Sequence, residues 1–145
     1  MIRKNDEAVR KSEEMRAIIF ANGDPGELLK EKARIGVNDL VIGADGGAIH
    51  ALNSGAPLNV VVGDLDSLAS RPDAFAELEN RGVKFEKYPV EKDFTDLELS
   101  LDYAIERGAS SVLILSPFGA RLDHLIGNIL LCTLAKYSAT EIALY

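Results

Sequence analysis

Short runs of β-branched and other apolar residues recur along this 145-residue chain, and they constrain its fold more than any other feature. The six runs are residues 16–21, 39–44, 59–63, 83–88, 111–115 and 141–145. Most are apolar at consecutive positions, which is typical of parallel strands that are covered on both faces. We therefore expect a sheet of about six mainly parallel strands.

Segments with helical spacing separate these runs. They cover residues 26–36, 70–82, 95–108 and 122–137. Ser70 is a candidate N-cap of the second segment. The last segment is apolar around most of its circumference, so we expect it to be buried on more than one side. Regular alternation of strand and helix predicts an α/β fold, Rossmann-like and open, with helices on both faces of the sheet.

Composition and charge limit the possible functions. The net charge of −7 argues against nucleic acid as a partner, because phosphate backbones need a basic surface. Cys132 is the only cysteine, so neither an intrachain disulfide nor a cysteine metal cluster is possible. Residues 1–15 are charged and do not resemble a signal peptide, and no window suggests a membrane span. We expect a cytoplasmic protein with a charged extension, 1–15, and one catalytic domain, 16–145.

Polar residues gather where the predicted strands end. Ligands of parallel α/β sheets bind beyond the carboxyl ends of the strands, so these residues are expected along one edge. They are Asn22 after the first strand; Asp45, Gly46 and Gly47 after the second; Asp64 and Asp66 after the third; Lys92, Thr95 and Asp96 after the fourth; and Arg121, Asp123 and His124 after the fifth.

Asp64 and Asp66 stand two residues apart directly after a run of valines. Carboxylates within about 4–6 Å raise one another's pKa unless a countercharge is present. Mg²⁺ is a natural countercharge, since it binds carboxylates together with substrate phosphates, whereas a chain poor in His and Cys is not suited to zinc. The sequence has neither a P-loop nor a dinucleotide-binding glycine motif. Gly46 and Gly47 would instead let backbone amides approach a phosphate.

Several of these residues also have structural explanations. Asp45, which precedes two glycines, can cap a helix, and Thr95 with Glu98 fits a capping box. Asp96 and Asp123 stand in predicted first helical turns, where acidic residues interact favourably with the helix dipole.

Other polar positions differ in how well a structural role explains them. Lys92 fits an exposed loop and His50 a surface or packing position. Arg121, His124 and Asn128 form a polar stripe on an otherwise apolar helix, which a structural role explains less well.

Four sequence blocks occur in the order and spacing of a known family. They are ADGGAIHAL (44–52), VVGDLDSL (61–68), EKDFTDLELSLDYA (91–104) and GARLDHLIGNILL (119–131). Together they resemble the catalytic N-terminal domain of thiamin pyrophosphokinase. The resemblance implies a magnesium-dependent enzyme that transfers the pyrophosphoryl group of ATP to the hydroxyl of thiamin, giving thiamin diphosphate and AMP.

The resemblance also implies roles for individual residues. The acidic metal and catalytic site would consist of Asp45, Asp64, Asp66 and Asp96. Arg121 would offset developing negative charge, and either Asp96 or Asp45 would accept the hydroxyl proton. The nucleotide and phosphate site would comprise Asn22, Gly46, Gly47, Lys92, Thr95, Arg121, Asp123 and His124, with Asn128 beside them.

Two features depart from the family pattern. Gly119-Ala120-Arg121 stands where the family has Gly-Gly-Arg. We also expect residues 16–145 to correspond to the catalytic domain alone, without the family's C-terminal β-rich domain. Since that domain and a partner subunit complete the family's thiamin site, we expect an incomplete site here and a homodimer in the full-length form. Two alternatives stay open: a pyrophosphokinase for another hydroxymethyl heterocycle such as a pterin, or a catalytically incomplete Mg·ATP-binding module.

Overall fold

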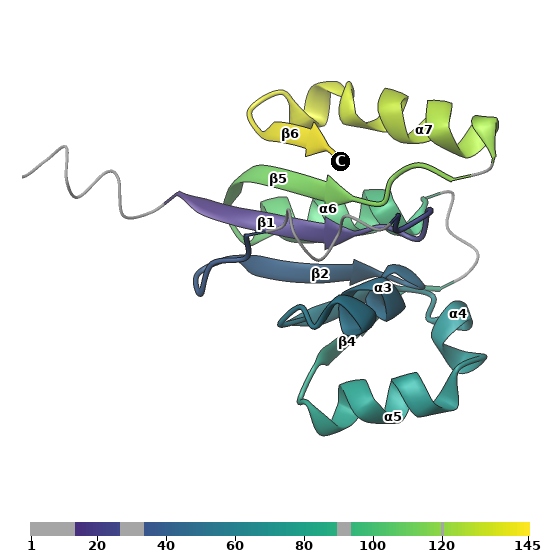
Figure 1. The fold of residues 1–145 in the computed structure, drawn as a ribbon. Coiled ribbons are helices and arrows are strands. Elements are labelled where there is room, and N and C mark those ends of the chain that lie inside the picture. The colour runs from purple at the N-terminus through teal and green to yellow at the C-terminus, as the bar shows by residue number, and fades with distance from the viewer. Residues whose placement is uncertain (1–13, 27–33, 90–93, 120) are drawn as a thin grey trace, which may run out of the picture.

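The structure is a computed structural model that describes residues 14–26, 34–89, 94–119 and 121–145. Its centre is a six-stranded sheet in the order β4-β3-β2-β1-β5-β6, and every neighbouring pair is parallel (Figure 1). The strands are β1 (Met15–Phe20), β2 (Leu40–Ala44), β3 (Val60–Gly63), β4 (Lys84–Lys87), β5 (Ala109–Leu115) and β6 (Glu141–Leu144). The predicted number and direction of strands are confirmed.

Burial on both faces explains why the strands read as continuous apolar runs. In β1, Ala17 and Ile19 belong to one buried cluster, whereas Ile18 and Phe20 belong to another on the opposite face. Neighbouring side chains of a strand point to opposite faces, so a covered strand needs an apolar residue at every position.

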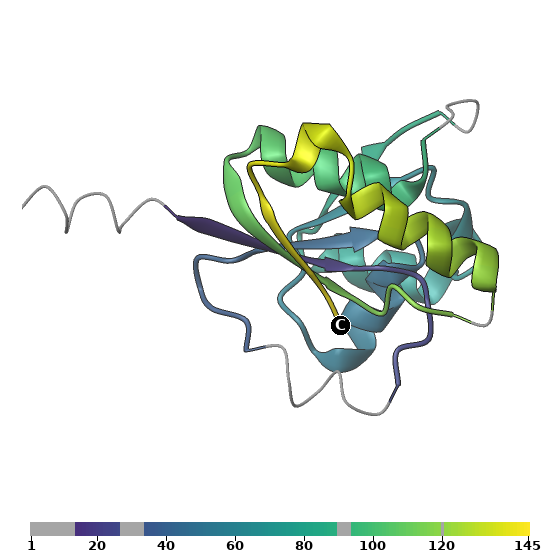
Figure 2. The ribbon, with the colours of Figure 1, turned by 90° about the horizontal axis from the view of Figure 1, so that it is seen from above.

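Helices cover both faces of the sheet, as predicted. Helices α3 (Gly47–Ser54) and α5 (Pro72–Asn80) pack against one face, and α6 (Asp96–Glu106) packs against the other (Figure 2). The remaining helices are the short α4 (Asp66–Ala69), α7 (Leu122–Cys132) and the 3₁₀ turn η1 (Ala135–Tyr137). Most of the helix predicted over 26–36, and most of the extension 1–15, lie outside the described residues.

Ser70 does not cap α5, contrary to the sequence prediction. That helix begins at Pro72 with Arg71 as its N-cap, and no side chain caps it. Ser70 is instead the C-cap of the preceding short helix α4, and its hydroxyl donates to the carbonyl oxygen of Ser67 in that helix.

The prediction that the last apolar helix is buried on more than one side is wrong. Within α7, Leu131 alone is buried, packed with Tyr137 in the cluster that α6 shares with the sheet. Leu122, Ile126 and Leu130 are 67%, 48% and 59% exposed. The apolar residues of a helix show that it can be buried, but they do not show that other elements pack against every side of it. The described residues pack against only one side of α7. No described helix combines the length and the apolarity that crossing a membrane requires.

Strand order brings the predicted loops together. Because all six strands run in the same direction, the loops after β1, β2, β3 and β5 leave the sheet at one edge. β1 is followed by β2 on one side of it, whereas β5 is followed by β6 on the opposite side. The connections after β1 and β5, which are neighbours in the sheet, therefore lead away from each other. Parallel α/β sheets bind ligands at this edge and near such a point of divergence.

Candidate active site

Asp45 is a buried acid with an unusual backbone. It follows β2 directly, is 5% exposed, and has a φ of 43°, in the left-handed region that few residues other than glycine adopt. One carboxylate oxygen, Oδ2, accepts the backbone N–H of Ser67 at 3.3 Å. The other, Oδ1, is buried and has no hydrogen-bond partner among the described residues. A strained backbone and an unsatisfied buried oxygen are features of functional sites.

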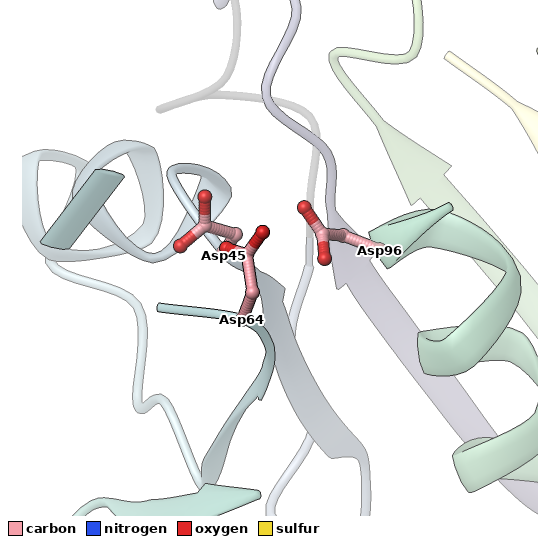
Figure 3. Close-up of side chains that lie close together, drawn as sticks. All are labelled: Asp45, Asp64 and Asp96. Atoms are coloured by element: carbon pink, nitrogen blue, oxygen red, sulfur yellow. The ribbon is translucent and has the colours of Figure 1, made fainter. Parts of the chain in front are cut away.

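Two further acids face Asp45. Asp64 follows β3, and Asp96 opens α6, where Thr95 is the N-cap and accepts the N–H of Glu98 at 3.2 Å. One carboxylate oxygen from each of Asp45, Asp64 and Asp96 lies within 4.8 Å of the other two (Figure 3). We call these three residues the acid cluster. The predicted capping role of Thr95 is confirmed, and it fixes the start of the helix that presents Asp96.

Gly63 makes room for the acid cluster, although it was not among the site residues predicted from the sequence. Its φ is 140°, and a Cβ there would lie 2.6 Å from Oδ1 of Asp96 and 3.3 Å from Cβ of Asp45. Any larger residue would push these two acids apart. The available signal was its place between a buried strand and Asp64, where a close approach of side chains favours glycine.

The acid cluster perturbs the ionisation of Asp96. Its pKa is raised from 3.8 to about 6, mainly by burial and then by the negative charges of Asp45 and Asp64. A carboxyl group in such surroundings needs a proton or a cation nearby.

The donor set fits a hard divalent cation. All three members of the acid cluster offer carboxylate oxygens, and Oδ1 of Asp45 is buried without a partner among the described residues. Mg²⁺ prefers oxygen ligands and uses one or two carboxylates alongside phosphates and water. The cluster therefore has the chemistry of a magnesium site.

Asp66 lies apart from the acid cluster. It is exposed as the first residue of α4, and its backbone N–H donates to Oδ1 of Asp64 at 3.0 Å. Leu65, between the two acids, has a left-handed φ of 67°, so the chain turns sharply there. The structure thus groups three of the four predicted metal ligands.

Asn22, Gly46 and Gly47 meet beside Asp45, where β1 and β2 end. A Cβ on Gly46 would lie 2.6 Å from the side-chain amide of Asn22, and a Cβ on Gly47 would lie 1.8 Å from the carbonyl oxygen of Phe20. Asn22 itself is exposed. Glycine is required at Gly47, where it lets the start of α3 approach the backbone of β1 closely, whereas the contact at Gly46 is with the exposed side chain of Asn22.

Arg121 and Asp123 pair with each other at the start of α7. Two guanidinium nitrogens of Arg121 donate to the carboxylate of Asp123 at 2.6 and 3.2 Å. This hydrogen bond lowers the pKa of Asp123. His124 is exposed, and Nδ2 of Asn128 donates to the carbonyl of Pro117 at 2.7 Å. Lys92 lies outside the described residues.

Ser116 follows β5 at the same edge of the sheet, although it was not among the site residues predicted from the sequence. Its φ is 56°, it is 4% exposed, and its hydroxyl has no partner among the described residues. No sequence pattern marks a serine that adopts a left-handed backbone.

Comparison with known proteins identifies the family. The model of the family described as "Thiamin pyrophosphokinase, catalytic domain" matches residues 33–144. The chain belongs to this family. Thiamine pyrophosphokinase of Bacillus subtilis strain 168 is 33% identical to it over 118 residues, which cover 79% of this chain and 53% of that protein.

Solved structures of other thiamin pyrophosphokinase family members share the fold. The enzyme from Bacillus subtilis superposes with a TM-score of 0.74 at 27% identity, over 91% of this chain and 60% of that one. A family member from Enterococcus faecalis superposes with a TM-score of 0.71 at 30% identity, over 90% of this chain and 61% of that one. The chain therefore spans about half the length of the curated relative and about three fifths of these structures.

Proposed function

We propose that this chain is the catalytic part of a magnesium-dependent thiamin pyrophosphokinase. In this reaction the thiamin hydroxyl attacks the β-phosphorus of ATP, a new O–P bond forms, and AMP leaves as thiamin diphosphate is produced. The observation that carries the proposal is the acid cluster, three carboxylates within 4.8 Å at the ligand-binding edge of the sheet. Family membership and the name of the curated relative support the choice of reaction.

The acid cluster would hold the magnesium ion of Mg·ATP. When bound, that ion neutralises phosphate charge and aligns the phosphates for in-line displacement. Asp45 offers a buried oxygen that is free of other described partners, and Asp64 offers an oxygen from the neighbouring strand end. Asp66, two residues after Asp64, would add negative charge near the ion from its exposed position.

Other residues of this edge would bind and orient the nucleotide. The Asn22 amide and the Gly46 and Gly47 backbone would contact phosphate oxygens. Arg121 would exchange its exposed pairing with Asp123 for a phosphate, because a guanidinium binds either anion through two hydrogen bonds. Lys92, Thr95, His124 and Asn128 complete the proposed nucleotide site.

Asp96 is the proposed proton acceptor for the thiamin hydroxyl. In the metal-free protein its pKa of about 6 makes it the most basic carboxylate for which a shift is resolved. The proposal also includes a homodimer for the full-length form, as the family resemblance implies, and the cytoplasmic location that was expected from the sequence.

Binding and turnover test the proposal separately. We expect calorimetric titration of the 145-residue chain to show Mg·ATP binding, and Asp64→Asn to weaken it at least about tenfold. Asp73→Asn is the matched control, since Asp73 is an exposed acid on α5 that is not a member of the acid cluster. A wild-type chain that binds no Mg·ATP, or an Asp64→Asn variant that binds it equally well, would overturn the metal-site assignment.

The acceptor is identified by following AMP release with thiamin and with 6-hydroxymethylpterin. Release with thiamin alone is the expected result, at a low rate because the thiamin site is expected to be incomplete in these residues. Release with the pterin alone would refute the proposed acceptor. Binding of Mg·ATP without release in either case would refute turnover by this chain and identify a nucleotide-binding module.

A further inference from the structure

The loops after β1 and β5 are joined to each other past the ends of the strands. We call residues 21–26 the β1 loop and residues 116–119 the β5 loop. Three backbone hydrogen bonds continue the β1–β5 pairing beyond or at the strand ends. In each, a backbone N–H of the β1 loop donates to a backbone carbonyl oxygen. The pairs are Ala21 to Leu115 at 2.8 Å, Gly23 to Ser116 at 2.9 Å and Asp24 to Phe118 at 2.7 Å.

Gly23 is the point of closest approach between these loops. A Cβ at this position would lie 2.4 Å from the carbonyl oxygens of both Ser116 and Phe118. One side of the β1 loop is therefore fixed by backbone packing against the β5 loop.

His50 reaches the β1 loop from another element, helix α3. Its Nε2 lies 2.9 Å from the carbonyl oxygen of Gly23. A carbonyl oxygen can only accept a hydrogen bond, so Nε2 carries the hydrogen and donates it. The His50 side chain is half-buried, and it ties Gly23 to the helix that begins beside Asp45.

The position of Gly23 determines that of its neighbour Asn22. The Asn22 amide lies against Gly46, whose Cβ, if present, would be 2.6 Å from three atoms of that amide. Gly46 follows Asp45 of the acid cluster. His50, Gly23, Asn22 and Gly46 thus form a continuous chain of contacts that ends next to Asp45.

We propose that His50 is a positioning residue for nucleotide binding. It holds the Gly23 carbonyl and so keeps the exposed Asn22 amide beside Asp45, where the amide donates to a phosphate oxygen of the nucleoside triphosphate. This inference rests on the proposed function. His50 does not touch the phosphate itself, and the magnesium ligands do not depend on it.

Three substitutions of His50 separate this role from a general contribution to stability. Gln places an amide N–H near the position of Nε2, whereas Asn places it too close to the backbone and Ala removes it. Loss of one such hydrogen bond corresponds to about a fivefold loss of affinity. We expect His50→Ala and His50→Asn to bind Mg·ATP about fivefold more weakly than wild type, and His50→Gln to stay within about twofold of it.

A second measurement, thermal stabilisation by MgCl₂ alone at pH 8, tests whether the acid cluster is intact. It should be the same in wild type and in all three variants, since His50 acts on the phosphates and not on the metal ligands. Variants that lose this stabilisation would show that His50 supports the whole site, which would overturn the specific role proposed.

The calorimetric outcomes distinguish this proposal from the proposed function. Equal Mg·ATP affinity in wild type, His50→Ala and His50→Asn would overturn the role of His50 alone. Equal weakening in all three variants, His50→Gln included, would also overturn it, because the reach of the donor would then be irrelevant. A wild-type chain that binds no Mg·ATP would overturn the proposed function as well.

Discussion

Asp96 makes the stability of the metal-free protein depend on pH in an unusual direction. The pKa of Asp96 is raised from 3.8 to about 6 by burial and by the charges of Asp45 and Asp64. Between about pH 4 and 6 the folded protein keeps a proton on Asp96 that the unfolded chain has lost. The contribution of Asp96 to the free energy of unfolding therefore falls as pH rises through this range, and it stays low above pH 6.

The size of the effect follows from the two pKa values. They differ by about 2, and a pKa difference of 1 corresponds to about 1.36 kcal/mol, which gives an upper bound of about 3 kcal/mol. Asp96 is only half-buried, so solvent screening reduces the expected value to about 1–1.5 kcal/mol. For a domain of this size, that corresponds to a change of about 4–6 °C in Tm.

Thermal unfolding in EDTA between pH 4 and pH 8, followed by circular dichroism, measures this contribution. At pH 4 wild type and Asp96→Asn should have similar Tm values, because a protonated carboxyl resembles an amide. At pH 7.5 the variant should melt about 4–6 °C above wild type, since it carries no charge into the acid cluster. Subtracting one curve from the other cancels the titration of the groups that do not interact with Asp96.

Asp73→Asn is again the control. Because Asp73 stands in the first turn of α5, the Tm of this variant should equal that of wild type or lie slightly below it near neutral pH, and never above it. A Tm difference between wild type and Asp96→Asn that is flat from pH 4 to 7.5 would refute the reasoning. So would a variant that loses stability relative to wild type as pH rises.

Three further predictions concern the edge that carries the acid cluster. At pH 8, millimolar MgCl₂ should raise the Tm of wild type but not of Asp64→Asn, and an equal rise in both would exclude Asp64 as a ligand. Gly63→Ala should lower the free energy of unfolding by about 2–3 kcal/mol in urea titrations and abolish the Mg²⁺ effect, because its Cβ meets Asp96 at a φ that alanine avoids. Its control, Gly127→Ala, adds a Cβ to an exposed site on α7 with open space and should stabilise by about 0.5–1 kcal/mol. Ser116→Gly should stabilise by about 1 kcal/mol in the same titrations, since it relieves a left-handed backbone and removes an unpaired hydroxyl, and a loss of stability would contradict both reasons.

Strand positions could be predicted because a covered parallel strand leaves a continuous apolar run. The run at 16–21 became β1, Met15–Phe20, and the run at 39–44 contains β2, Leu40–Ala44. The order of strands in the sheet could not be predicted in this way, since a local pattern does not say which strand will be its neighbour. The general rule that loops of parallel strands meet at one edge was enough to predict that Asp45 and Asp64 lie close together.

The details of the site depend on backbone conformations that residue types do not reveal. Asp45, Leu65 and Ser116 all adopt left-handed φ values although none is glycine. The turn at Leu65 separates Asp66 from the acid cluster, and that separation was not expected from a spacing of two residues. His50 was expected to be a surface or packing residue. Its contact with Gly23 could not be predicted, because it joins two segments that are far apart in the chain.

The central place of β1 in the sheet has a consequence for synthesis of the protein. β1 is made first, and β2, β3 and β4 can add to one of its edges in the order in which they leave the ribosome. Its other edge stays without a partner until residues 109–115 have emerged and form β5. Unpaired strand edges promote association between chains. The partial sheet of β1 to β4 is therefore more prone to association between chains than the complete sheet, in which β5 pairs with this edge and β6 then pairs with β5.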